Sequence, residues 1–127
     1  MNIVDSSGWL AYFADDKNSS RFAPPLADTD NLLVPAISIY EVFKVLLRES
    51  GEDAALQATA AMQRGHVVDL TPQLAIAAAT LSHKLSLPMA DSIILAAARE
   101  HNATVWTQDV DFKGLESVKY FPAKGTG

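Results

Sequence analysis

Short apolar segments alternate with longer segments of helical periodicity along the chain, and this alternation limits the folds that the chain can form. The sequence predicts strands at about residues 2–4, 32–34, 66–70, 104–107 and 118–121. It predicts helices at about residues 6–13, 38–50, 52–64, 72–85 and 90–101. Strands that alternate with helices build βαβ units. We therefore expect an α/β fold of three layers, with a mostly parallel sheet of four to five strands and helices on both faces.

Individual residues indicate where some of these elements begin and end. Ser6 is the expected N-cap of the first helix, and Gly65 is the expected C-cap of the helix near residue 64. Ser38 and Glu41 have the spacing of a capping box, in which the glutamate reaches back to the N-cap amide. The Pro24-Pro25 pair can only begin or interrupt a helix, so no element is assigned there.

Composition sets the class of the protein. The 127 residues suffice for one domain with a hydrophobic core, expected at residues 1–122, with a flexible tail at residues 123–127. The chain has no cysteine, which excludes disulfides and thiolate metal sites and suits a cytoplasmic location. No apolar run approaches the roughly 18 residues of a membrane span. The formal charge of −5 disfavours nucleic-acid binding through lysine and arginine alone.

Two acids stand where strands are predicted to end. Asp5 directly follows the first strand, and Asp109 lies two residues beyond the strand that ends at Thr107. Ligands of open parallel sheets bind outside the carboxyl ends of the strands, near a switch point. Asp111 follows in the same turn as Asp109, although acids are also common in solvated turns.

Two further acids lie on helices. Asp91 is in the first turn of its helix, on the same side as an apolar stripe. Stabilisation of the helix dipole explains why an acid stands in the first turn, but it does not explain why that acid shares the apolar face. Glu41 has structural explanations of its own, in the capping box or in ion pairs with Lys44 and Arg48. Lys44 and Arg48 are also candidates for phosphate binding, although a solvated helix face is the simpler explanation of both.

Four carboxylates in one place would need a cation. Two of them about 5 Å apart repel by roughly 3 kcal/mol at an effective dielectric constant near 20. No basic residue adjoins Asp5, Asp91 or Asp109 in sequence. Oxygen ligands without cysteine or histidine favour Mg²⁺ or Mn²⁺. Such an ion activates water and neutralises phosphate charge. The ion, and not lysine or arginine, would then attract the nucleic acid to this negatively charged chain.

The chain resembles the PIN-domain family, and within it the VapC-type toxins of toxin–antitoxin modules. Four segments in the same order carry the resemblance: Ile3-Val4-Asp5-Ser6-Ser7, residues 35–42 around Glu41, residues 87–98 around Asp91, and Thr107-Gln108-Asp109-Val110-Asp111-Phe112. It implies hydrolysis of RNA phosphodiesters with Mg²⁺ or Mn²⁺. The implied catalytic and metal-binding residues are Asp5, Glu41, Asp91 and Asp109.

The same resemblance implies supporting residues and partners. Thr107 would orient the acids, Asp111 would be a weaker outer acid, and Ser7 belongs to the first motif. The partners would be RNA, a cognate antitoxin protein and a second copy of the chain in a homodimer. The apolar helix from Ile39 to Leu47 suits such a surface, although a place in the core is the simpler explanation. Pro24-Pro25 departs from the regular helix of the relatives.

Two alternatives remain open from the residues alone. A receiver-like signalling domain, phosphorylated on aspartate, fits the length and the alternation, and Asp69 ends a strand. However, a receiver domain needs a paired acid after its first strand, and Asp5 is followed by Ser6. It also needs a lysine just past the last strand, whereas Lys119 lies within that strand. The second alternative is a catalytically idle PIN scaffold that only binds a protein partner. The presence of all four acids argues against it.

Overall fold

Five parallel strands form the central sheet of the computed structural model, which describes residues 1–123. The strand order is β3-β2-β1-β4-β5. The strands are β1 (Asn2–Val4), β2 (Leu32–Pro35), β3 (His66–Val68), β4 (Thr104–Thr107) and β5 (Val118–Tyr120). The predicted parallel sheet is confirmed. This order differs from the 2-1-3-4-5 order of receiver domains, so the topology contradicts the receiver-like alternative.

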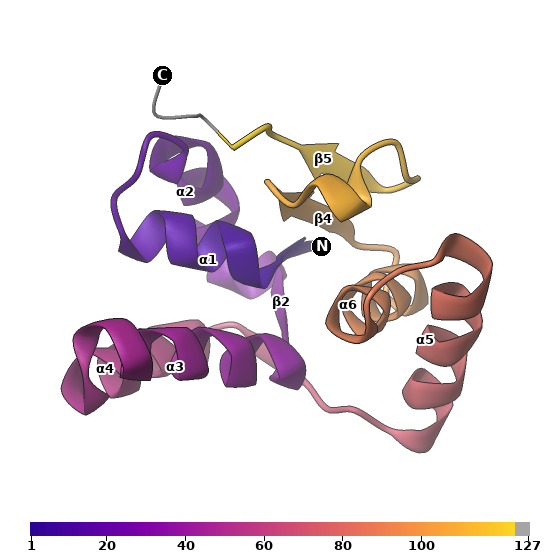
Figure 1. Cartoon of the computed structure of the whole chain (residues 1–127), viewed down its shortest axis with the longest axis horizontal. Coiled ribbons are helices and arrows are strands. Elements are labelled where there is room, and N and C mark those ends of the chain that lie inside the picture. Colours follow the sequence, from indigo (N-terminus) through magenta and orange to yellow (C-terminus); the bar gives the residue numbers. More distant parts are fainter. Residues whose placement is uncertain (124–127) are drawn as a thin grey trace.

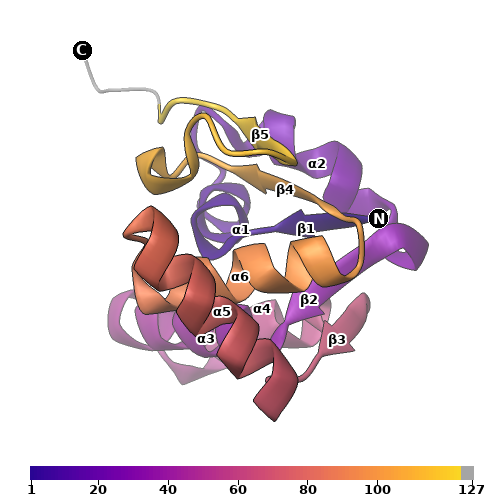
Figure 2. The ribbon, with the colours of Figure 1, turned by 90° about the vertical axis from the view of Figure 1, so that its right-hand side faces the viewer.

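Six α-helices cover the two faces of the sheet within the described residues. They are α1 (Ser6–Phe13), α2 (Ser19–Ala27), α3 (Ala36–Ser50), α4 (Glu52–Met62), α5 (Pro72–Leu85) and α6 (Met89–Glu100). Helices α1 to α4 lie on one side of the sheet and α5 and α6 on the other (Figure 1). Figure 2 looks through α5 and α6 onto the strands, with β5 and β3 at the two edges. Short 3₁₀ turns lie at η1 (Thr29–Asn31) and η2 (Val110–Phe112).

The alternation of side chains along the strands divides the core into two halves. Ile3 and Leu33 pack with α5 and α6, whereas their neighbours Val4 and Val34 pack with the helices of the other face. In α6, residues 91–98 form an unbroken buried run, which places this helix at the centre of its layer. The N-terminal residues of α6 lie at the carboxyl ends of β1 and β4.

Two predicted helix caps, Ser6 and Gly65, are wrong. Asp5, and not Ser6, caps α1, because its Oδ1 accepts from the Gly8 amide at 3.0 Å. The helix near residue 64 ends at Met62 with Gln63 as its C-cap, so Gly65 does not cap it. Gly65 instead allows close packing, since a Cβ there would lie 2.9 Å from the Leu32 carbonyl oxygen.

The proline pair lies inside a helix. Pro24 and Pro25 are part of α2, so the expected departure from a regular helix is wrong. Each proline lacks an N–H and removes one helical hydrogen bond. Burial of Phe22, Pro25 and Leu26 against the sheet offsets this loss.

Neither the expected C-terminal tail nor the domain boundary before it is tested by the described residues. The expected tail at residues 123–127 falls almost wholly on residues 124–127, which lie outside the described residues, so the domain boundary at residue 122 stays a prediction. Within residues 1–123 every helix is too short or too polar to cross a membrane.

Candidate metal centre

The ends of β1 and β4 bring the first two acidic motifs together. The two strands are parallel neighbours, with Val4 paired to Trp106. The Asp5 amide continues this ladder and donates to the Trp106 carbonyl at 3.1 Å. Asp5 and Thr107 therefore leave the sheet side by side, although about a hundred residues separate them in the sequence. This is the switch point of the sheet, because the chain proceeds outward from β1 in one direction and from β4 in the other.

Asp5 lies in a buried hydrogen-bond network. Its side chain is 2% exposed. Oδ1 accepts from Ser7 Oγ at 2.8 Å and from the Gly8 amide at 3.0 Å, and Oδ2 accepts from Thr107 Oγ1 at 2.8 Å. Burial raises the pKa of Asp5 to about 6, against the lowering effect of these hydrogen bonds. Both oxygens of Asp5 are thus engaged by the protein.

Thr107 and Ser7 connect Asp5 to the turn that follows β4. Thr107 is fully buried, and its Oγ1 accepts from the Asp109 amide at 2.9 Å while it donates to Asp5. Ser7 Oγ accepts from the Gln108 amide at 3.3 Å. The structure therefore places these two supporting residues between Asp5 and Asp109, where their hydroxyls hold the turn against the start of α1.

Three carboxylates form a cluster beside this network. One oxygen each of Asp91, Asp109 and Asp111 lies within 4.8 Å of the others. Asp91 comes from the first turn of α6, Asp109 is the N-cap of η2, and Asp111 lies within η2. The Asp111 amide donates to Asp109 Oδ1 at 2.9 Å, which holds the two turn acids together. We name Asp91, Asp109 and Asp111 the acidic cluster.

The acidic cluster is electrostatically strained. Burial raises the pKa of Asp91 to about 8, and the negative charge of Asp109 is the next cause, followed by smaller effects of Asp5 and Asp111. Within the described residues no ion pair reaches these carboxylates; Arg48 pairs with Glu49 at 3.3 Å. The repulsion expected from the sequence is therefore present and is not relieved by a basic side chain.

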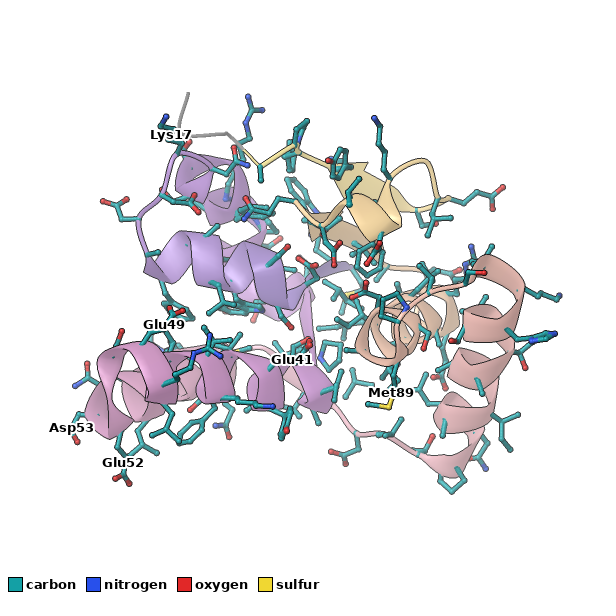
Figure 3. The ribbon with its side chains drawn as sticks, in the orientation of Figure 1. Lys17, Glu41, Glu49, Glu52, Asp53 and Met89 are labelled. Carbon is teal, nitrogen blue, oxygen red and sulfur yellow. The ribbon has the colours of Figure 1, made fainter. Side chains whose placement is uncertain are left out.

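Glu41 occupies a place that the capping-box interpretation did not predict. Helix α3 begins at Ala36 with Pro35 as its N-cap, so Ser38 is inside the helix and Glu41 is not at N3. Glu41 Oε1 instead accepts from Ser6 Oγ at 2.5 Å. Figure 3 shows Glu41 near the start of α3, on the side toward α1. Glu41 thus adjoins the Asp5 motif through Ser6 and stands outside the acidic cluster.

The candidate phosphate ligands lie apart from the acids. Lys44 Nζ lies 5.7 Å from the centre of the Tyr40 ring. The Arg48 side chain is 68% exposed and pairs with its neighbour Glu49. Neither forms the ion pair with Glu41 that the helical spacing allowed. Their proposed contact with RNA stays a prediction.

The donors suit a hard divalent cation. A magnesium ion binds oxygen at about 2.1 Å, so two of its ligands lie at most about 4.2 Å apart. The three carboxylate oxygens of the acidic cluster lie within 4.8 Å of one another, which is close to this limit. Three carboxylates without nitrogen or sulfur ligands match Mg²⁺ or Mn²⁺. The cluster includes Asp111, which the sequence assigned to an outer position, whereas Asp5 and Glu41 are not among its members.

The sequence did not indicate the roles of two residues around the centre, Ser6 and Asn18. Ser6 was assigned to helix capping but holds Glu41. Asn18, in the polar loop before α2, donates from Nδ2 to Gln108 Oε1 at 3.0 Å. Hydroxyl and amide side chains in loops are common, and only the fold shows that these contacts span up to 90 residues.

Comparison with known proteins identifies the family and the fold of the chain. The family model of the PIN domain matches residues 3–117. A search of curated proteins gives no match. Among solved structures, a toxin–antitoxin complex from Klebsiella pneumoniae has a TM-score of 0.82 at 18% identity, covering 97% of this chain and 100% of that chain.

Two further structures are similar along nearly their full length. VapC20 of Mycobacterium tuberculosis, described as a sarcin-ricin loop cleaving toxin, has a TM-score of 0.74 at 20% identity, covering 93% of this chain and 98% of that one. VapBC2 of Rickettsia felis, bound to a DNA fragment from the promoter, has a TM-score of 0.73 at 13% identity, covering 95% and 97%. At such identities the likeness shows the fold. Because the family model spans most of the sequence, the chain belongs to the PIN-domain family.

Proposed function

We propose that the protein is a metal-dependent endoribonuclease that hydrolyses RNA phosphodiester bonds. The observation that carries this proposal is the acidic cluster, whose carboxylates come from the first turn of α6 and from η2 with its N-cap, and which lacks a basic partner within the described residues. Such a site suits a divalent cation, and a cation at a solvent-facing sheet edge can attract phosphate despite the negative net charge.

Each acid has a distinct role in this proposal. Asp91, Asp109 and Asp111 would hold Mg²⁺ or Mn²⁺, which would supply Lewis-acid activation of water and neutralise charge on the phosphate. Asp5 keeps Thr107 and the following turn in place through its buried hydrogen bonds, and it adds negative charge behind the cluster. Glu41 is held at Oε1 by Ser6, and its Oε2 accepts no hydrogen bond within the described residues, so it is our candidate proton acceptor. The products would carry a 5′-phosphate and a 3′-hydroxyl.

We further propose a place in a type II toxin–antitoxin system, in the cytoplasm. The support comes from neighbours of the same fold: one is a toxin–antitoxin complex, and another is described as a toxin that cleaves the sarcin-ricin loop. The proposed partners are a cognate antitoxin and a second copy of the chain in a homodimer. A small open reading frame for a DNA-binding protein immediately upstream would support the assignment.

RNA cleavage with and without a chelator tests the enzymatic proposal. Purified protein is incubated with labelled RNA in Mg²⁺, in Mn²⁺ and in excess EDTA. We expect cleavage in the presence of either metal, no cleavage in EDTA, and recovery when the metal is restored. Cleavage that persists in EDTA would contradict metal dependence.

The idle-scaffold alternative requires a separate measurement. Titration calorimetry with Mn²⁺ should show a specific site if the acidic cluster is functional, whereas an idle scaffold should show none. The absence of a specific Mn²⁺ site would favour the scaffold.

A further inference from the structure

The protein holds Gln108 in one orientation. This residue lies between Thr107 and Asp109 and is half-buried. Its backbone amide donates to Ser7 Oγ at 3.3 Å, and its side-chain Oε1 accepts from Asn18 Nδ2 at 3.0 Å. Backbone and side chain are therefore both attached to other segments of the chain.

Asn18 determines which side of the Gln108 amide faces outward. Asn18 is 1% exposed, and its Nδ2 also donates to the Pro122 carbonyl at 3.0 Å. A carbonyl oxygen can only accept, so Asn18 must turn its NH₂ group toward Pro122 and hence toward Gln108. Gln108 must then present Oε1 to Asn18 and direct Nε2 elsewhere. Within the described residues Nε2 donates no hydrogen bond, which leaves two donors available.

A groove runs from this position along α1 and α3. Its volume is about 450 Å³. At one end its walls are Ser7 and Gln108, the residues that adjoin Asp5 and Asp109. Figure 3 shows Glu49 farther along, between α1 and α3. A strand of RNA whose phosphate lies at the acidic cluster can thus place a neighbouring nucleotide in the groove.

The lining of the groove suits a base better than a phosphate. Leu10, Phe13 and Leu46 supply apolar and aromatic surface, whereas Asp16 and Glu49 supply negative charge that repels phosphate. Unpaired RNA bases stack on aromatic rings and are read through hydrogen bonds at their edges. An amide NH₂ group recognises an acceptor atom of a base, such as a carbonyl oxygen or a ring nitrogen.

We propose that Gln108 Nε2 donates a hydrogen bond to an acceptor of an unpaired RNA base next to the cleaved bond, and that Asn18 is the residue that positions it. This inference rests on the proposed endoribonuclease function. It assigns base preference near the cut to Gln108, separately from the carboxylates that carry the chemistry.

Two variants of Gln108 test the contact. Gln108→Met removes the amide, and Gln108→Glu keeps an acceptor for Asn18 but replaces the Nε2 donor by oxygen. RNA randomised at the positions around the cut is cleaved in Mn²⁺, and products are sequenced to obtain relative kcat/KM for each base. We expect both variants to lose about 3- to 10-fold in kcat/KM for the preferred base through KM, as for one neutral hydrogen bond. The preference at that position should flatten in both variants, whereas the kcat and the Mn²⁺ affinity of the uncharged Gln108→Met should not change.

A third variant tests the role of Asn18. In Asn18→Asp a carboxylate oxygen replaces the NH₂ group, so Gln108 should rotate and turn Nε2 inward. We expect the same flattening of base preference, and no additional loss when Asn18→Asp is combined with Gln108→Met. If Asn18→Asp does not fold, Gln108→Met and Gln108→Glu still decide the proposal.

The results separate this inference from the proposed function. Wild-type protein that cleaves no RNA overturns both. Wild-type cleavage with unchanged base preference in Gln108→Met overturns only the inference. A loss of kcat for all bases alike in Gln108→Met, or a loss of Mn²⁺ affinity in that variant, also overturns the inference, because Gln108 would then serve only to hold the Asp109 turn.

Discussion

Burial and like charge act on the same carboxylates at the sheet edge. Burial is the largest cause of the raised pKa of both Asp5 and Asp91, to about 6 and about 8. For Asp91 the charge of Asp109 adds to it. The ionised form of these groups is therefore costly until a cation neutralises it. Ionisable groups whose pKa values are shifted by burial and by neighbouring charges are expected at functional sites.

Replacement of Asp91 tests this assignment at a single position. Asp91→Asn keeps the size and the place of the side chain but removes its charge. We expect RNA cleavage in Mg²⁺ to fall by at least about 100-fold and Mn²⁺ affinity to fall by about 10- to 100-fold, the range typical of disturbed metal sites. Gel-based cleavage assays and titration calorimetry measure the two effects.

Asp53→Asn provides the matched control for Asp91→Asn. Asp53 is exposed near the start of α4 and takes no part in the network around the metal centre (Figure 3). This variant should cleave RNA and bind Mn²⁺ like wild type. An Asp91→Asn protein that cuts RNA as fast as wild type would remove the proposed mechanism.

Stability of the metal-free protein should depend on pH through the same group. The pKa of Asp91 is raised in the folded state from its ordinary value of 3.8 to about 8, so the folded protein binds the proton more tightly than the unfolded chain does. The resulting stabilisation is fully present below pH 4 and is lost as the pH rises through about 8. Wild type should therefore lose stability relative to Asp91→Asn between pH 5 and pH 8.

Urea unfolding in EDTA at pH 5, 6.5 and 8 measures this difference. We expect the free energy of unfolding of wild type, relative to Asp91→Asn, to fall by about 1–2 kcal/mol over this range, a value reduced for partial solvent screening. The opposite trend, or a difference that is constant with pH, would show that Asp91 is ionised at low pH and is not strained by burial.

Local residue patterns predicted only part of the site. Asp5 and Asp109 follow apolar runs, and the geometry of parallel sheets places such residues together. The contact between Glu41 and Ser6 is different, because the Ser38–Glu41 spacing has a local explanation that the structure contradicts. Asn18 carries no sequence pattern that indicates its contact with Gln108, which depends on the packing of three segments.

At the level of the elements, agreement depends on how local the determinants are. The predicted helix at residues 72–85 and strand at residues 104–107 have the observed bounds, because proline at the helix start and β-branched residues in the strand act locally. Helix α2 was not predicted, since its two prolines disfavour a helix locally and only tertiary burial compensates for them. The strand order likewise depends on packing of distant segments.

Close packing of α1 against the sheet and α2 sets the position of the Asp5 motif. A Cβ atom at Gly8 would lie 2.5 Å from Val4 Cγ1 and 2.9 Å from two atoms of the Phe22 ring. Gly8→Ala should therefore destabilise the protein by about 1–3 kcal/mol, as overpacked cores do. Thermal or urea unfolding measures this change.

Ser20→Ala on α2 is the control for the Gly8 variant. Ser20 is exposed, so its replacement by alanine should change stability by less than about 0.5 kcal/mol. Gly8→Ala with the stability of wild type would mean that α1 can move away from Val4 and Phe22 without loss.

For the whole molecule, metal binding should couple to folding. The acidic cluster joins residue 91 to residues 109 and 111, and Asp5 links it to the first strand, so the intact fold is needed to assemble it. A ligand that binds only the folded state stabilises it by about 2.7 kcal/mol at 100 times its dissociation constant. Saturating Mn²⁺ at pH 7.5 should therefore raise the melting temperature by several degrees, and EDTA should reverse the rise.

The Asp91→Asn variant is the control for metal-induced stabilisation. It should show a much smaller rise in melting temperature with Mn²⁺, whereas Asp53→Asn should respond like wild type. An equal rise in all three proteins would indicate non-specific binding to a chain with a formal charge of −5.

Our account requires Asp91 of α6 and the two acids at η2 to form one cation site, and anomalous diffraction from crystals soaked in Mn²⁺ tests this most directly. We predict an anomalous peak within about 2.0–2.3 Å of carboxylate oxygens from Asp91 and from at least one of Asp109 and Asp111. No peak at this place in millimolar Mn²⁺, or a peak only at other surface acids, would contradict the account.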